Sequence, residues 1–272
     1  MASNIHHGSN TPLLAASDPP PVSVVNGAGA SPFLFIGDHA GNVIPSRLDA
    51  LGLGAEELGR HIAIDIGVHG LGERLAEAMD ATFIRQTYSR LVVDCNRYPD
   101  APDAVAQVSD GTAIPANADL TPADRAARFD EIHEPYQRAI GAEIARRIAA
   151  GVPPILISLH SFTPALRGGG PRGGSLRPWH VGVLHDAGRA EFARAMLAAF
   201  AADGSLVVGD NEPYRMDTID YTVPRHAYPA GLAYAELEVR QDLIGDDEGQ
   251  RRWATIIARA LATAATGLDR EG

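Results

Sequence analysis

Several polar side chains in the sequence are of the types that hydrolytic enzymes use, and each lies in or just after a short apolar segment. They are His39, Asn96, Arg97, His160 and Glu238. In open α/β sheets, ligands bind at the carboxyl ends of strands, where the ends of different strands meet. Imidazoles and a carboxylate gathered there form the donor set of a hydrolytic zinc site, which needs three protein ligands and an open position for water. The sequence therefore predicts metal-assisted hydrolysis.

Two glutamates in the last apolar segment, Glu236 and Glu238, are separated by one residue. Because the side chains of a strand alternate between its faces, the two carboxylates are expected on the same face. A buried face with two carboxylates is costly unless a metal ion or an arginine compensates the charge. The pair therefore favours a functional site, with either glutamate as the general base.

The same residues also have purely structural interpretations. A histidine after a strand is more often a hydrogen-bonded loop residue than a metal ligand. The alternative for Arg90 and Arg97 is a salt bridge to Asp94 or another acid. A salt bridge of this kind would stabilise a loop without contacting any substrate.

Nucleophilic catalysis is less consistent with the sequence. Ser158 and Ser161 bracket His160, but there is no Gly-x-Ser-x-Gly turn of the kind that exposes a nucleophilic serine. Cys95 precedes Asn96, and a nearby cation can lower a thiol pKa, yet a buried structural cysteine is the more common case.

Composition limits the partners of this chain of 272 residues. Its net charge of −11 argues against binding to nucleic acid, but a local arginine cluster can still hold a small anion. The single cysteine excludes an internal disulfide and cysteine-rich zinc modules. No apolar run approaches the about 18 residues that a membrane span needs. The first residues do not resemble a signal peptide, so a cytoplasmic location is expected.

Apolar segments alternate with segments of helical period along the chain. The predicted strands are residues 32–37, 82–87, 91–94, 154–160, 180–185, 206–209 and 232–239. The predicted helices are residues 67–79, 121–150, 187–202 and 248–265. Thr121, Pro122 and Asp124 form a helix start signature, and Asp65 is a plausible N-cap. This alternation predicts one α/β domain with a mixed, largely parallel sheet flanked by helices.

Two segments lack a helical or strand period. Residues 1–30 are expected to form a mobile N-terminal arm, although residues 22–25 could pair as an edge strand. The glycine-rich residues 167–175 lack the Lys-Ser/Thr ending of a phosphate-binding loop, so a flap beside a site and a plain surface loop are equally good interpretations. Residues 221–226 are expected to form a polar loop near the last strand.

Five short motifs, in this order, resemble the N-formylglutamate amidohydrolase family. They are residues 37–45, 64–67, 89–97, 158–161 and 235–240. The resemblance spans about residues 32–262, so we expect residues 31–272 to form one domain of this kind. The family is similar to the zinc carboxypeptidases, which implies a zinc-exopeptidase-like fold and one Zn²⁺ per chain.

The resemblance also implies roles for individual residues. His39 and His160 would bind the metal, Glu238 would be the general base, and Asn96 and Arg97 would hold a substrate carboxylate. Arg90 and Arg225 are further candidates for substrate binding. The chain departs from the carboxypeptidase pattern His-x-x-Glu, because Asn42 stands where the glutamate would be. Asp65 is the best candidate for the missing ligand, and Asp38 is the next.

Three functions are consistent with these motifs. The first is a zinc amidohydrolase for an N-acyl amino acid such as N-formyl-L-glutamate. The second is a zinc peptidase acting on small or cell-wall peptides, with the difference expected to lie in residues 168–174 and around Arg225. The third is a metal-free binding module, an alternative that Asn42 leaves open.

Overall fold

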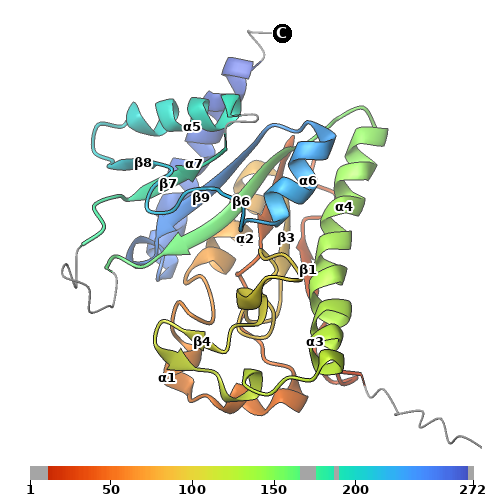
Figure 1. Cartoon of the computed structure of the whole chain (residues 1–272). Helices are drawn as coiled ribbons and strands as arrows, with labels where there is room; N and C mark the ends of the chain where they lie inside the picture. Colours follow the sequence, from red (N-terminus) through yellow and green to blue (C-terminus); the bar gives the residue numbers. More distant parts are fainter. Residues whose placement is uncertain (1–11, 166–175, 187–189, 269–272) are drawn as a thin grey trace, which may run out of the picture.

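A computed structural model describes residues 12–165, 176–186 and 190–268 of the chain. A seven-stranded sheet forms its centre, with the strand order β1-β3-β2-β6-β9-β7-β8 (Figure 1). The strands are β1 (Val22–Val25), β2 (Phe33–Gly37), β3 (Thr82–Gln86), β6 (Ile155–Phe162), β7 (Val181–Leu184), β8 (Val208–Asp210) and β9 (Tyr234–Arg240). Only the β1–β3 and β7–β9 pairs are antiparallel. The predicted α/β class with a mixed, largely parallel sheet is confirmed.

Helices cover both faces of the sheet. On one face lie α2 (Val68–Met79), α5 (Glu191–Ala201) and α7 (Asp247–Leu268), and on the other lie α4 (Glu134–Ala149) and α6 (Thr222–Ala230) (Figure 1). Strand β2 shows why its sequence is apolar throughout. Phe33 and Phe35 pack with the first set of helices, whereas Leu34 and Ile36 pack with the second.

Short elements form a separate layer beyond the carboxyl ends of β2 and β3. They are η1 (Ser46–Gly52), α1 (Ala55–Leu58), η2 (Pro102–Val105), β4 (Val108–Ser109), β5 (Thr112–Ala113), η3 (Pro115–Asn117), α3 (Pro122–Arg128) and η4 (Phe129–His133). A third apolar cluster holds this layer together and includes Leu51, Tyr88 and Val92. The last short element, η5 (Gln241–Leu243), directly follows β9.

One predicted strand, residues 91–94, is wrong. These residues form turns inside the third cluster, where their backbone bonds to side chains and loops instead of to a strand. Arg128 donates to the carbonyl of Val92 at 2.9 Å, and the amide of Asp94 donates to the carbonyl of Ala104 at 2.7 Å. The segment is apolar because it is buried in this cluster. An apolar run of four residues does not distinguish a buried turn from a strand.

The helix start at Thr121 is confirmed, since Thr121 and Asp124 form a reciprocal capping box. The predicted helix 121–150 is divided by the π-helical turn η4. Residues 221–226, predicted as a loop, instead begin α6, and Asp65 does not cap α2, whose N-cap is Gly67. The predicted N-cap is wrong because the Asp65 side chain bonds elsewhere.

Residues 12–30 of the predicted N-terminal arm belong to the fold. Strand β1 pairs with β3 as the edge strand that residues 22–25 suggested, and the amides of Leu13 and Leu14 donate to the carboxylate of Glu131. Residues 1–11 of the arm and the glycine-rich residues 167–175 lie outside the described residues. Among the described helices, none is long and apolar enough to cross a membrane.

Candidate active site

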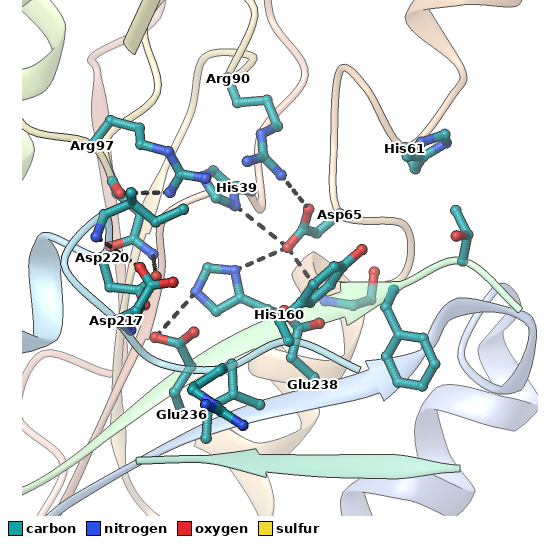
Figure 2. A pocket seen from close by; sticks show the side chains of 18 residues that line it. His39, His61, Asp65, Arg90, Arg97, His160, Asp217, Asp220, Glu236 and Glu238 are labelled. Atoms are coloured by element: carbon teal, nitrogen blue, oxygen red, sulfur yellow. Dashed lines mark hydrogen bonds and ion pairs between the residues drawn. The ribbon is translucent and has the colours of Figure 1, made fainter. Parts of the chain in front are cut away.

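A cavity of about 350 Å³ opens at the carboxyl ends of β2, β6 and β9. Of the residues predicted to act on a substrate or a metal, Arg225 and the alternative ligand Asp38 do not line it. The residues that do are His39, Asp65, Arg90, Asn96, Arg97, His160 and Glu238 (Figure 2). The parallel arrangement of β2, β6 and β9 explains the gathering, because residues that end neighbouring parallel strands share one edge of the sheet.

Two histidines and one aspartate converge inside this cavity. Nδ1 of His160 lies 3.0 Å from Oδ2 of Asp65, and Nδ1 of His39 lies 3.5 Å from the same oxygen (Figure 2). All three side chains are buried, and one donor atom from each lies within 4.8 Å of the others. Asp65, which the sequence suggested as the third ligand, therefore lies next to both histidines.

The outer nitrogen of each imidazole faces a partner that fixes the ring. Nε2 of His39 donates to Asp94 at 2.7 Å, while Nε2 of His160 lies 3.0 Å from the hydroxyl of Ser158 and 3.5 Å from Oδ2 of Asp38. Histidines that bind metals typically donate their other N–H to such a carboxylate or polar group. Both Nδ1 atoms are thereby left to face the centre of the cavity.

The donor geometry fits a metal ion. For bond lengths of about 2.1 Å, the ligand atoms of a tetrahedral zinc site are separated by roughly 3.4 Å. The two Nδ1 to Oδ2 separations of 3.0 and 3.5 Å agree with this value. Nδ1 of His39 is buried and has no hydrogen-bond partner among the described residues, so a metal would satisfy an atom that the protein leaves unpaired.

The buried carboxylates and imidazoles of this cluster shift one another's pKa values. Burial opposes the ionisation of Asp65, but His39, His160 and Arg90 outweigh it and lower the pKa of Asp65. Burial also disfavours the charged form of His160, yet Glu236, Asp38 and Asp65 raise its pKa well above the usual value. The acids around the imidazoles therefore favour the protonated form of both rings, with which a metal ion would compete.

Strand β9 brings both predicted glutamates to the cavity. Glu238 lies opposite His160 in the β6–β9 register, and Glu236 lies opposite Ser158. Their Oε2 atoms are buried without a hydrogen-bond partner among the described residues. Burial raises the pKa of Glu238 to about 7 and the pKa of Glu236 well above its usual value. The two glutamates share one face of the strand, as the alternation predicts.

The arginines differ in how they are held. Arg90 pairs with Asp94 at 2.7 Å and with Asp65 at 3.2 Å, which is the salt-bridge alternative considered for it. Arg97 also forms a salt bridge, from Nε to Asp103 at 2.9 Å, and it donates from Nη1 to the carbonyl of Asn96. Arg90 therefore stabilises the carboxylates behind the histidines, and Arg97 extends along the cavity wall.

Asn96 connects the cavity wall to helix α6. Its Oδ1 accepts the backbone N–H groups of Tyr221 and Thr222 at 2.9 and 3.0 Å, and its Nδ2 donates to Asp220 at 3.3 Å. The amide thus satisfies the first N–H groups of the helix, as an N-terminal cap does.

We expect Asn96→Ala to lower the free energy of unfolding by about 2–3 kcal/mol, because two buried N–H groups lose their acceptor. Urea denaturation monitored by circular dichroism measures this change. A loss below about 0.5 kcal/mol, the level of an ordinary surface substitution, would contradict the structural role of the amide.

Arg225 is the predicted site residue that the structure does not bring to this cavity. It lies in α6, where its guanidinium carbon is 5.2 Å from the centroid of the Tyr221 ring and Nη1 pairs with Glu134 at 3.3 Å. It lines a neighbouring hollow instead, together with Tyr98 and Tyr228. The segment is a helix that directs Arg225 toward Glu134 at the start of α4.

The connection from β8 to α6 supplies cavity residues that the sequence analysis did not assign. They are Tyr214, Arg215, Asp217 and Asp220. No periodicity marks this connection. The available signal was its polar composition next to the last strand, since loops at strand ends commonly supply functional residues.

Comparisons with known proteins agree with the fold and the motifs. The model of the family described as N-formylglutamate amidohydrolase matches residues 31–245. The crystal structure of gene product Atu2144 from Agrobacterium tumefaciens has a TM-score of 0.89 and 34% identity, over 94% of this chain and 99% of that chain. The N-formylglutamate amidohydrolase from Ralstonia eutropha JMP134 has a TM-score of 0.66 and 19% identity, over 90% of this chain and 97% of that chain, and supports the fold alone.

A search of curated proteins finds no match to this chain. The family model nevertheless covers most of the sequence, including the five motifs and every residue that lines the cavity. The chain belongs to the N-formylglutamate amidohydrolase family.

Proposed function

We propose that this protein is a zinc-dependent amidohydrolase that removes the acyl group from an N-acyl amino acid, with N-formyl-L-glutamate as the reference substrate. The observation that carries the proposal is the convergence of His39, Asp65 and His160 in a cavity that Glu238 and Arg97 also line. The cavity combines a metal donor set, a general base and a cation for a substrate carboxylate.

His39, Asp65 and His160 would hold one Zn²⁺ per chain. When bound, zinc supplies Lewis acidity, which polarises the acyl oxygen and acidifies the attacking water. Asn42 was the reason to consider a metal-free binding module as an alternative. Its Nδ2 donates to the carbonyl of Leu58 at 2.6 Å, while the buried Asp65 supplies a carboxylate beside the histidines. These contacts favour the metal-binding alternative.

Glu238 would act as the general base and then as the general acid. It takes a proton from the water whose oxygen adds to the acyl carbon, and it returns that proton to the amine nitrogen as the carbon–nitrogen bond breaks. The products from a formyl substrate are formate and the free amino acid. This role is supported by the position of Glu238 opposite His160 and by an Oε2 atom with no hydrogen-bond partner in the described part of the chain.

Arg97 would bind the substrate carboxylate, because a guanidinium offers paired N–H donors to the two oxygens. Asn96 positions Arg97 through its carbonyl, which accepts from Nη1 at 2.9 Å. Arg90 is committed to Asp94 and Asp65, so we assign it to positioning these carboxylates.

The function is tested by release of formate from N-formyl-L-glutamate and from other N-formyl amino acids by the purified protein. The expected result is turnover that a chelator removes and that stoichiometric Zn²⁺ restores. Turnover that survives complete metal removal would contradict metal dependence. Hydrolysis of small peptides without release of formate from any formyl amino acid would favour the peptidase alternative.

The pH dependence of turnover should report Glu238. Burial raises the pKa of this carboxyl to about 7, and only its ionised form accepts a proton. A cation at the histidines favours the ionised form, so the inflection is expected at or below pH 7. Below the inflection, kcat/KM should fall about tenfold per pH unit. A rate that stays constant from pH 5 to 8 would contradict the assignment.

Replacing Arg97 with alanine should mainly weaken substrate binding. Loss of a charge-assisted pair to a carboxylate is expected to raise KM about 30-fold or more, with a smaller change in kcat. Steady-state kinetics measures both constants, and an unchanged KM would remove Arg97 from substrate binding. Arg225→Ala is the matched control, because Arg225 lies outside the cavity.

A further inference from the structure

One side of the cavity is lined by carboxyl groups that the proposed reaction does not use. Asp217, Asp220 and Glu236 lie together there, on the same side of the histidines as Arg97 (Figure 2). Glu238 and the metal ligands lie in the centre of the cavity. The side with Arg97 is therefore where the amino acid half of an N-acyl substrate would lie when Arg97 holds its carboxylate.

Glu236 is the least satisfied of these acids. The residue is 3% exposed, and its Oε2 has no hydrogen-bond partner among the described residues. The nearest cation is Nε2 of His160 at 4.0 Å, beyond hydrogen-bond distance, and that nitrogen already faces Ser158 at 3.0 Å. A buried carboxylate oxygen without a partner is costly, so an atom that completes it would bind there favourably.

Asp220 is buried as well, and its contacts are to neutral groups. Its Oδ1 accepts from Nδ2 of Asn96 at 3.3 Å, and its Oδ2 accepts from the amide of Asp217 at 2.9 Å. Within residues 12–165, 176–186 and 190–268, no cation forms an ion pair with Asp220 or with Asp217. Among the described residues, both therefore add carboxyl groups without an ion-pair partner to this wall of the cavity.

In the described part of the chain, the arginines of the cavity form no ion pair with the acids on this side. Arg90 is paired with Asp65 and Asp94, and Arg97 is paired with Asp103. Arg215 also lines the cavity, but it is exposed, and in the described part of the chain it forms no ion pair with Glu236. An anionic side chain would be placed against three acidic groups here, whereas a cationic side chain would find the unpaired Oε2 of Glu236.

We propose that the site selects N-acyl amino acids with a cationic side chain, an ammonium or a guanidinium, over those with an anionic side chain. Arg97 holds the α-carboxylate, and Glu236 and Asp220 receive the side-chain cation, with Asp217 adding negative charge nearby. Glu236 is in this account a specificity-determining residue. The inference rests on the proposed amide hydrolysis and replaces glutamate, the reference amino acid of the family, with a basic one.

Turnover by the zinc-loaded protein tests the inference without any substitution. The panel keeps the formyl group constant and varies the side chain: N-formyl-L-lysine, N-formyl-L-arginine, N-formyl-L-norleucine and N-formyl-L-glutamate. We expect kcat/KM for the better basic substrate to exceed the value for norleucine by about 10-fold or more, with glutamate lowest. Equal values, or a preference for norleucine or glutamate, would overturn the inference.

A binding measurement separates failure of the inference from failure of the proposed function. Calorimetry with the free amino acids L-lysine, L-norleucine and L-glutamate needs no turnover. If no formyl substrate is hydrolysed, the proposed function fails. Tighter binding of lysine than of norleucine and glutamate would still support a pocket for a cationic side chain. Tighter binding of glutamate, or no binding of lysine at millimolar concentration, would overturn the inference whether or not the protein hydrolyses amides.

Two substitutions then identify the residues that recognise the cation. Glu236→Gln and Asp220→Asn should each reduce the ratio of kcat/KM for lysine to that for norleucine by about 10-fold. A purely structural role would lower both values together and leave the ratio unchanged, which would overturn the assignment of Glu236. Glu248→Gln, an exposed glutamate at the start of α7, is the matched control and should leave the ratio unchanged.

Discussion

In the Glu238→Gln variant, kcat is expected to fall by about 10³-fold, the typical contribution of a general base, while the fold and the metal content persist. The substitution keeps the shape of the side chain and removes the carboxylate that accepts the proton. Its Oε2 makes no hydrogen bond to the described residues, so the substitution breaks no hydrogen bond of that oxygen. Formate release, zinc content and thermal unfolding of the same preparation measure the three quantities.

Glu248→Gln on the exposed start of α7 is the control for the chemistry of the substitution and should behave as the unmodified protein. Retention of more than a tenth of the turnover by Glu238→Gln would exclude Glu238 as the base. Loss of zinc together with turnover would instead indicate that Glu238 supports the metal site.

In the Asp65→Asn variant, zinc is expected to be lost during dialysis and turnover with it. The carboxylate faces Nδ1 of both histidines, at 3.0 and 3.5 Å. Removal of an outer partner typically costs about 10–100-fold in metal affinity, and loss of a direct ligand should cost more. Zinc titration against a competing chelator measures the affinity.

Asp38→Asn is the informative comparison, because Asp38 was the other candidate for the third ligand. Its carboxylate lies 3.5 Å from Nε2 of His160, on the outer side of the ring, and accepts from Thr222 at 2.6 Å. We expect a weaker effect from Asp38→Asn, within the range for outer partners. If Asp38→Asn abolished zinc binding and Asp65→Asn did not, the ligand assignment would be reversed.

The sheet was predictable because its central strands are buried on both faces. Strand β2 needs apolar residues for two sets of helices, and this requirement produces the continuous run that the sequence shows. The same reasoning misassigned residues 91–94, which are buried under loops. It also missed α6, since the prolines Pro224 and Pro229 and the polar residues between them do not look helical.

The centre of the site was predictable from its place at strand ends, whereas its rim was not. His160 and Glu238 are neighbours in the β6–β9 register, so strand assignment alone brings them together. Asp220 lies at the cavity next to Asn96, and the hydrogen bond between them joins residues 124 positions apart. Such contacts depend on packing between distant segments, and a single sequence does not show them.

The central claim is that a metal ion lies among His39, Asp65 and His160. Diffraction data collected above and below the zinc absorption edge, from crystals of the purified and active protein, test it most directly. We expect one anomalous peak per chain, about 2.0–2.2 Å from Nδ1 of each histidine and from a carboxylate oxygen of Asp65. A peak bound by other residues, or the absence of any peak in crystals of a preparation that releases formate, would contradict it.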